Sequence, residues 1–167
     1  MKTLILMRHT KAAAPIPDQP DFDRSLAPRG EENARALGAW LREHNHIPDL
    51  ALVSSAQRTR ETWEGLAMED QVPVKLVDDL YDAVPSGYFS LLGKLESDSA
   101  LIIGHNPTVA SVAEHTLRET EVPAALSSYP TGATAVIRFD VDDWDAITKA
   151  PGTLANWIVP RQLTASA

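Results

Sequence analysis

The 167-residue sequence contains no cysteine, and this absence excludes several kinds of chemistry. Disulfide bonds, thiolate catalysis and cysteine-ligated metal sites cannot form. Long hydrophobic runs are also missing, because no apolar stretch approaches the roughly 20 residues that span a membrane. The apolar start of the chain is interrupted at Arg8, which is too early for a secretory signal. We therefore expect a cytoplasmic protein that has no membrane partner.

Basic residues are scarce relative to acidic ones. Lysine and arginine number 15 against 23 aspartates and glutamates, which gives a formal net charge of −8. An acidic surface repels nucleic acid and anionic lipid, so neither is an expected partner. Any anion that this protein binds must therefore enter a local basic pocket. The length predicts a single domain over residues 1–167, and we expect a monomer.

Four short apolar runs alternate with helical patterns along the first two thirds of the chain. The runs cover residues 4–7, 50–53, 72–77 and 100–103, and they lack polar alternation, as strands buried on both faces do. Pro28 and Pro107 suit the first positions of the first and last of these helices. The alternation predicts an α/β fold, a three-layer sandwich with a mostly parallel central sheet and helices on both faces.

The pattern changes after Pro123. Residues 132–140 and 153–159 predict two late strands that pair at an edge of the sheet, in an antiparallel arrangement. The residues between them predict a polar turn region. Residues 12–23 are rich in proline and aspartate, which predicts an exposed loop directly after the first strand. This loop is placed where it could flank a site.

Charged and polar side chains follow each of the four early runs. In open α/β sheets, ligands bind beyond the carboxyl ends of the strands, so these side chains are expected to meet. In chain order they are Arg8 and His9, Arg58 and Arg60, Asp78, Asp79 and Asp82, and finally His105. Arg60 lies two positions after Arg58 and is expected on another face of its helix. The sequence thus predicts a cationic pocket on an acidic protein.

This set of side chains suits phosphoryl transfer without a metal or another cofactor. Arginine forks match phosphate oxygens in a bidentate way. A neutral histidine is a nucleophile that can form a covalent intermediate. A second histidine can donate a hydrogen bond to the transferring group. Phosphoryl transfer needs little beyond positioning and charge stabilisation, and these side chains supply both.

Three ordered motifs resemble those of the histidine phosphatase superfamily, which has the phosphoglycerate mutase-like fold. They are "LMRHTKA", "SSAQRTRETW" and "LIIGHNPTV", and the short length with "DFDRSLAPRG" and "LYDA" resembles the SixA-type phosphohistidine phosphatases. The resemblance covers nearly the whole chain and implies a metal-free phosphatase that works through a phosphohistidine intermediate. His9 would attack phosphorus, while Arg8, Arg58 and His105 would bind the phosphoryl oxygens.

Two positions depart from the superfamily pattern. Thr10 stands where the superfamily more often has glycine, so we expect the geometry of this loop to differ slightly from that of the superfamily. Asp82 falls about where larger members carry a proton-donating acid, although it could equally be an ordinary turn aspartate. A phosphohistidine substrate lessens the need for that acid, because imidazole is a better leaving group than an alkoxide.

His44 and His46 fit a helix end better than a metal site.

Three functions follow from these observations. The leading expectation is a phosphatase that removes phosphate from phosphohistidine on a protein. The same chemistry could instead hydrolyse a small phosphorylated metabolite or nucleotide. A non-catalytic module that only binds phosphate is the third, and the presence of both histidines and both arginines argues against it.

Overall fold

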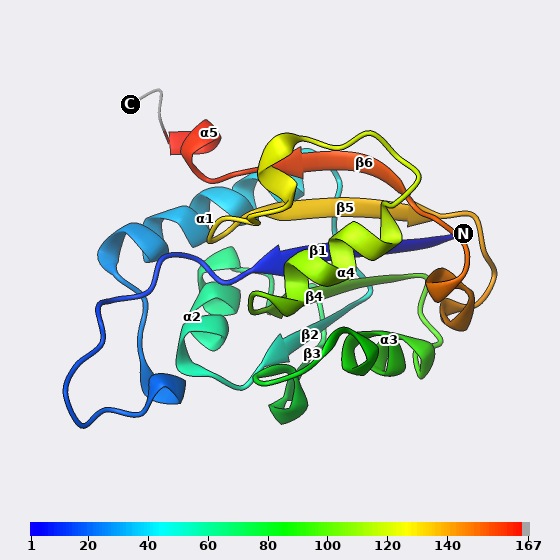
Figure 1. The fold of residues 1–167 in the computed structure, drawn as a ribbon. Helices are drawn as coiled ribbons and strands as arrows, with labels where there is room; N and C mark the ends of the chain where they lie inside the picture. Colours follow the sequence, from blue (N-terminus) through cyan, green and yellow to red (C-terminus); the bar gives the residue numbers. More distant parts are fainter. Residues whose placement is uncertain (165–167) are drawn as a thin grey trace.

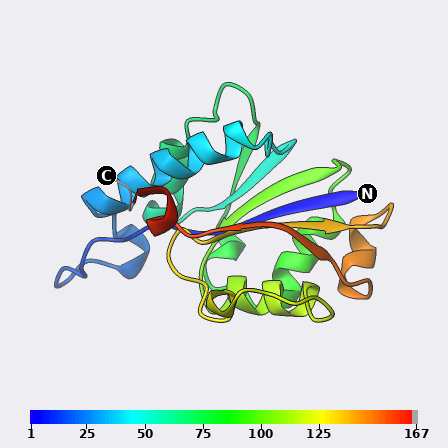
Figure 2. The same cartoon turned by 90° about the horizontal axis from the view of Figure 1, so that it is seen from above.

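The computed structural model describes residues 1–164 as an α/β sandwich around one six-stranded sheet (Figure 1). The strand order is β3-β2-β4-β1-β5-β6. Figure 2, which views the molecule from above, shows helices on both sides of the sheet. The predicted three-layer architecture is therefore confirmed.

The first four strands run parallel, as the alternation of strands and helices predicts. They are β1 (Lys2–Arg8), β2 (Leu50–Ser54), β3 (Val74–Val77) and β4 (Ser99–Gly104). The prediction that all four are buried on both faces is wrong for β3, which lies at the edge of the sheet and is largely exposed. A short apolar run indicates a strand without showing whether that strand has neighbours on both sides.

The two late strands are antiparallel to their neighbours. Strand β5 (Thr134–Phe139) pairs with β1, and β6 (Thr153–Ile158) pairs with β5 and forms the second edge. The predicted antiparallel edge strand is thus β6, whereas β5 lies inside the sheet. The predicted polar turn between them contains a 3-10 helix, η4 (Trp144–Thr148), which buries Trp144 and Ile147.

Two helices cover each face of the sheet. On one face lie α1 (Pro28–Glu43) and α2 (Gln57–Leu66), and on the other lie α3 (Pro85–Gly93) and α4 (Thr108–Thr116). Helix α4 begins one residue after Pro107, whose carbonyl accepts a hydrogen bond from the Ser111 N–H at 3.0 Å, so Pro107 precedes the first helical position expected for it. Short helices complete the chain: η1 (Asp21–Asp23), η2 (Asp78–Leu80), η3 (Ala124–Leu126) and α5 (Arg161–Thr164).

Burial on both faces of the sheet explains why the central strands are apolar throughout. In β1, Leu4 and Leu6 pack into the cluster under α3 and α4, while Ile5 and Met7 pack under α1 and α2. Successive side chains point to opposite faces, so a strand covered on both sides shows no alternation.

Among residues 1–164, the helices are too short or too polar to span a membrane.

Candidate active site

The pairing of β1 with β4 brings the two predicted active-site histidines together. The parallel register sets Arg8 opposite Gly104, so the next residue of each strand is a histidine. The His9 N–H donates to the Gly104 carbonyl at 3.2 Å, and the centroids of the two imidazole rings lie 5.4 Å apart. Both rings are buried. The carboxyl ends of two neighbouring strands therefore form the floor of the candidate site.

The His9 ring is fixed in one tautomer. Its Nδ1 lies 2.7 Å from the carbonyl oxygen of Thr10, and a carbonyl can only accept, so Nδ1 carries the proton. The Arg58 Nε–H donates to His9 Nε2 at 3.4 Å, which requires that Nε2 carries no proton. Burial lowers the pKa of His9 to about 3, helped by the nearby charges of His105 and the two arginines. His9 is therefore neutral at pH 7, and its Nε2 is unprotonated, with its electron pair beside Arg58.

Arg58 is held by a loop that lies far away in the sequence. Its guanidinium donates to the Asp21 carbonyl oxygen at 2.8 Å and to the Asp21 carboxylate at 3.0 Å. The Tyr81 hydroxyl donates to the same carboxylate at 2.5 Å, and the Arg58 guanidinium lies 5.7 Å from the centre of the Tyr81 ring. The Tyr81 hydrogen bond and then Arg58 lower the pKa of Asp21 to about 2. Asp21 thus stays ionised and orients Arg58.

Arg8 brings a positive charge that has no acidic partner within residues 1–164. One of its terminal nitrogens donates to the Tyr129 carbonyl at 3.1 Å, and its buried Nε has no hydrogen-bond partner among the described residues. Burial and the neighbouring Arg58 lower the pKa of Arg8, but a guanidinium remains protonated in proteins. An anion in this place would supply the missing acceptor and the missing negative charge.

His105 is positioned by Ser54, the last residue of β2. The Ser54 hydroxyl lies 2.8 Å from His105 Nε2, and it also accepts the Ala56 N–H at 3.4 Å. Among the described residues the Ser54 hydroxyl proton has no other acceptor, so we assign it to the bond with Nε2, which leaves the ring proton on Nδ1. That buried Nδ1 has no partner among the described residues. Burial lowers the pKa of His105 to about 4, and Arg58 contributes to the same shift.

These side chains line a single cavity of about 320 Å³. Its polar wall comprises Arg8, His9, Lys11, Arg24, Arg58, His105, Asn106 and Thr131. Within residues 1–164 no three histidine, aspartate or glutamate side chains gather as metal ligands do. The positive charge that faces this cavity therefore comes from arginine and lysine side chains. Such a cavity can bind a phosphoryl group and present it to His9 Nε2.

Comparison with known proteins decides the family. A family model described as "Histidine phosphatase superfamily (branch 1)" matches residues 4–83. An uncharacterized protein from Mycobacterium leprae is 33% identical over 164 residues, which cover 93% of this chain and 100% of the relative. The chain belongs to the histidine phosphatase superfamily.

Solved structures of this superfamily include two that match nearly the whole chain. A proposed phosphohistidine phosphatase SixA from Agrobacterium tumefaciens is 30% identical with a TM-score of 0.83, over 95% of this chain and 98% of that one. A second, from Nakamurella multipartitia, is 26% identical with a TM-score of 0.85, over 95% of this chain and 96% of that one. The likeness places this chain among the SixA-type members of the superfamily, as a phosphatase with the phosphoglycerate mutase-like fold.

Asp82 lies beside this cavity and not in its wall. Its exposed side chain lines a neighbouring cavity together with Tyr81, His105 and Asn106. Within residues 1–164 no side chain forms a salt bridge or a hydrogen bond with the Asp82 carboxylate. Its role as the proton-donating acid of a histidine phosphatase therefore stays a prediction.

Thr10 fits the loop that follows β1 without requiring glycine. Its backbone is outside the left-handed region, and its N–H donates to the Thr62 hydroxyl at 3.1 Å. The Thr10 side chain is fully buried against α2. Thr10 therefore ties the loop that carries His9 to α2.

The sequence did not single out several residues of the site, both in the cavity wall (Lys11, Arg24, Asn106 and Thr131) and among the partners of the predicted residues. Asp21 and Tyr81 brace Arg58, and Ser54 braces His105. The loop of residues 12–23 was predicted to flank the site, and "LYDA" was noted, so the segments carried a signal. No sequence signal identified the individual partners, because they lie 37 to 60 residues from the groups that they bind.

Proposed function

We propose that this histidine phosphatase removes the phosphoryl group from phosphohistidine on a protein. His9 Nε2 attacks phosphorus, forming a new N–P bond as the bond to the substrate imidazole breaks. The substrate ring leaves with the electron pair as neutral imidazole, provided that its other nitrogen carries a proton. Water then attacks the phosphorus on His9 and releases inorganic phosphate, which regenerates neutral His9.

The tautomer of His9 is the observation that carries this proposal. Because Nδ1–H is bound to the Thr10 carbonyl, the free electron pair of Nε2 is the one next to Arg58. Arg8 and Arg58 neutralise the phosphoryl oxygens and keep them in reach of that pair. His105 lines the same cavity as His9 and donates to a further oxygen.

The preference for phosphohistidine rests on the position of the nearest acid. Asp82 is exposed and lies outside the cavity of His9, so little is available to protonate an alkoxide leaving group. Imidazole leaves without such help. The likeness to proteins described as SixA phosphohistidine phosphatases supports the same choice.

A substrate comparison tests the proposal. We expect the purified protein to hydrolyse a phosphohistidine peptide with a kcat/KM at least about 100-fold above that for phosphate monoesters of metabolites and nucleotides, since general acid assistance contributes that much to difficult leaving groups. Equal or better turnover of a monoester would favour the alternative, a small-molecule phosphomonoesterase. That function would then require Asp82, so Asp82→Asn is the variant to compare.

A third outcome would revive a non-catalytic role. Tight binding of inorganic phosphate with no turnover of any substrate would make the chain a phosphate-binding module.

A further inference from the structure

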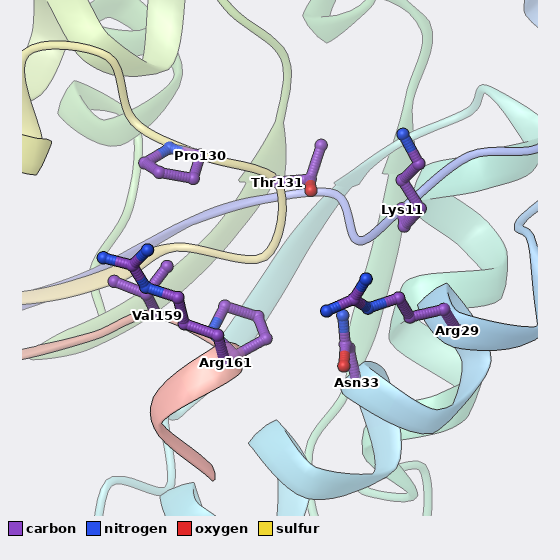
Figure 3. A pocket seen from close by; sticks show the side chains of 8 residues that line it. Lys11, Arg29, Asn33, Pro130, Thr131, Val159 and Arg161 are labelled. Atoms are coloured by element: carbon purple, nitrogen blue, oxygen red, sulfur yellow. The ribbon is translucent and has the colours of Figure 1, made fainter. Parts of the chain in front are cut away.

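A second cationic cavity opens beside the one that holds His9. Its polar lining consists of Lys11, Arg29, Asn33, Thr131 and Arg161, and its volume is about 230 Å³. Figure 3 shows the three cations coming from three separate elements: Lys11 from the loop after β1, Arg29 from α1 and Arg161 from α5. We infer that this cavity binds carboxylate side chains that flank the phosphohistidine of the substrate protein, an inference that rests on the proposed function.

The positive charges of this cavity are not neutralised within the protein. Lys11, Arg29 and Arg161 form no salt bridge with any residue of the described part of the chain. Only Lys2, Arg24 and Arg58 form salt bridges among the described residues, so most lysines and arginines of the chain also lack one. This cavity is distinguished by three such cations lining one hollow on a chain of net charge −8. An anion from outside would complete the set.

An amide in the cavity wall adds a second indication of a ligand. Asn33 is only 8% exposed, and it lines the cavity from α1, the helix that also carries Arg29 (Figure 3). None of the described residues makes a hydrogen bond with its side chain, and its amide atoms are not among the buried unpartnered ones, so they are open to the cavity. Its amide N–H groups suit a carboxylate oxygen.

Close backbone contacts fix this cavity relative to His9. The Ala27 N–H donates to the Lys11 carbonyl at 2.9 Å, and a Cβ at Gly30 would lie 2.1 Å from that same oxygen. On the other side, the Gly132 N–H donates to the His9 carbonyl at 2.8 Å. The start of α1 and the loop before β5 are thereby anchored to the loop that carries the nucleophile.

The two cavities adjoin each other, because Lys11 and Thr131 line both. A substrate with its phosphoryl group at His9 can therefore reach Arg29 and Arg161 with an adjoining segment. A protein segment with acidic side chains on either side of its phosphohistidine would supply carboxylates there. A small molecule would need a second anionic group, such as a phosphate, to make the same contacts.

Paired peptides test this inference. One phosphohistidine peptide has glutamates on both sides of the phosphohistidine, and the other has glutamines at the same positions. We expect the wild-type protein to hydrolyse the glutamate peptide with a kcat/KM about tenfold higher. Arg29→Gln or Arg161→Gln should lower this ratio about fivefold, which is the scale of one partly exposed charge pair.

Arg35→Gln is the matched control for general charge effects. Arg35 also lies on α1 and is exposed, but it lines a different cavity with Glu31, Glu61 and Glu64. Its loss changes the net charge by the same amount, so the peptide ratio should stay at the wild-type value. A matched pair of small substrates, a bisphosphate and its monophosphate, completes the set.

Each outcome decides the inference. Equal rates on the two peptides, or an equal loss in the Arg35→Gln variant, would overturn it while the proposed function stands. Sensitivity to Arg29 and Arg161 with the bisphosphate alone would also overturn it and would assign the cavity to a second phosphate. If the wild-type protein hydrolyses neither peptide, the proposed function itself fails.

Discussion

The protein has two pairs of neighbouring histidines, one at each end of the sheet. His9 and His105 lie at the carboxyl ends of β1 and β4, with ring centroids 5.4 Å apart. His44 and His46 lie near the opposite end, after α1 and before β2, with ring centroids 6.2 Å apart. One member of the second pair, His46, also lines a cavity, and Arg138 lines the same cavity. Similar residues in similar proximity therefore occur twice.

The two pairs differ in the charges beside them. One ring nitrogen of each histidine is bonded in both pairs: His44 Nδ1 to the Trp40 carbonyl at 2.9 Å and His46 Nε2 to the Asn156 amide at 2.7 Å, and likewise His9 Nδ1 and His105 Nε2 in the first pair. Several arginine and lysine side chains line the cavity of the first pair, whereas Arg138 is the one cation among the described residues that lines the cavity of His46. The pair that lies beside several anion-binding cations is therefore the candidate active site.

Of the changes considered, removal of Arg8 should have the largest effect on catalysis. We expect Arg8→Ala to lower kcat/KM about 100- to 1,000-fold, because a charge that stabilises the transferring group is lost. Arg138→Ala, at the other end of the sheet, should leave kcat/KM within about twofold of the wild type. Steady-state kinetics on the phosphohistidine peptide measures both. A loss below tenfold in Arg8→Ala would show that Arg8 is not a phosphate ligand.

Acid should destabilise the protein through the first pair. Burial sets the pKa of His9 to about 3 and that of His105 to about 4 in the folded chain. The unfolded chain therefore binds more protons between these values and about 6.5. The free energy of unfolding should fall as the pH is lowered through this window, by about 1 kcal/mol per pH unit for each buried histidine.

Urea denaturation at pH 7 and at pH 4.5 measures this dependence. His9→Asn should show a shallower decline than the wild type, because one of the two groups is gone. An unchanged slope in that variant would mean that His9 is not held neutral by the fold.

Replacement of Ser54 tests how His105 is positioned within the first pair. Ser54→Ala removes the hydroxyl that bonds to His105 Nε2, and we expect kcat/KM to fall about tenfold. Ser54 acts through His105 and is a positioning residue, so nitrogen-15 NMR of the His105 ring provides a separate readout. The wild-type ring should have its proton on Nδ1, and the variant should show a mixture of tautomers. A tautomer that does not change would contradict this role.

The smallest effect on catalysis is expected at the second pair. His46→Ala removes the bond to Asn156 and leaves part of the core unfilled, so the free energy of unfolding should fall by about 1–2 kcal/mol. Turnover should remain within about twofold of the wild type. Urea denaturation and steady-state kinetics on one preparation give both values. A large loss of turnover would place the second pair in the function.

The strand-end positions were predictable from the sequence, and their neighbours were not. A buried strand followed by Arg8 and His9, and another followed by His105, places these residues at one edge of a parallel sheet. The register that brings the rings to 5.4 Å, and the Asp21 loop that reaches Arg58, depend on tertiary packing. No local pattern records such contacts.

The departures in the fold have the same origin. Residues 72–77 have the apolar composition of a central strand, but β3 has a neighbour only on one side. Trp144 belongs to a polar stretch in the sequence, but it is buried because its ring packs into the cluster under α3 and α4, where its ring N–H donates to the Ser97 carbonyl at 2.7 Å. Composition predicts which segments form strands, while the burial of a segment depends on what packs beside it.

Trapping of the phosphoenzyme tests the central claim most directly. The protein is incubated with a phosphohistidine peptide that is labelled in the phosphoryl group, and then it is quenched in acid or in base. We expect a label that is stable in base and lost in acid, located by mass spectrometry on His9, present in His46→Ala and absent in His9→Asn. Full phosphatase activity in His9→Asn, or a label on another residue, would contradict the account.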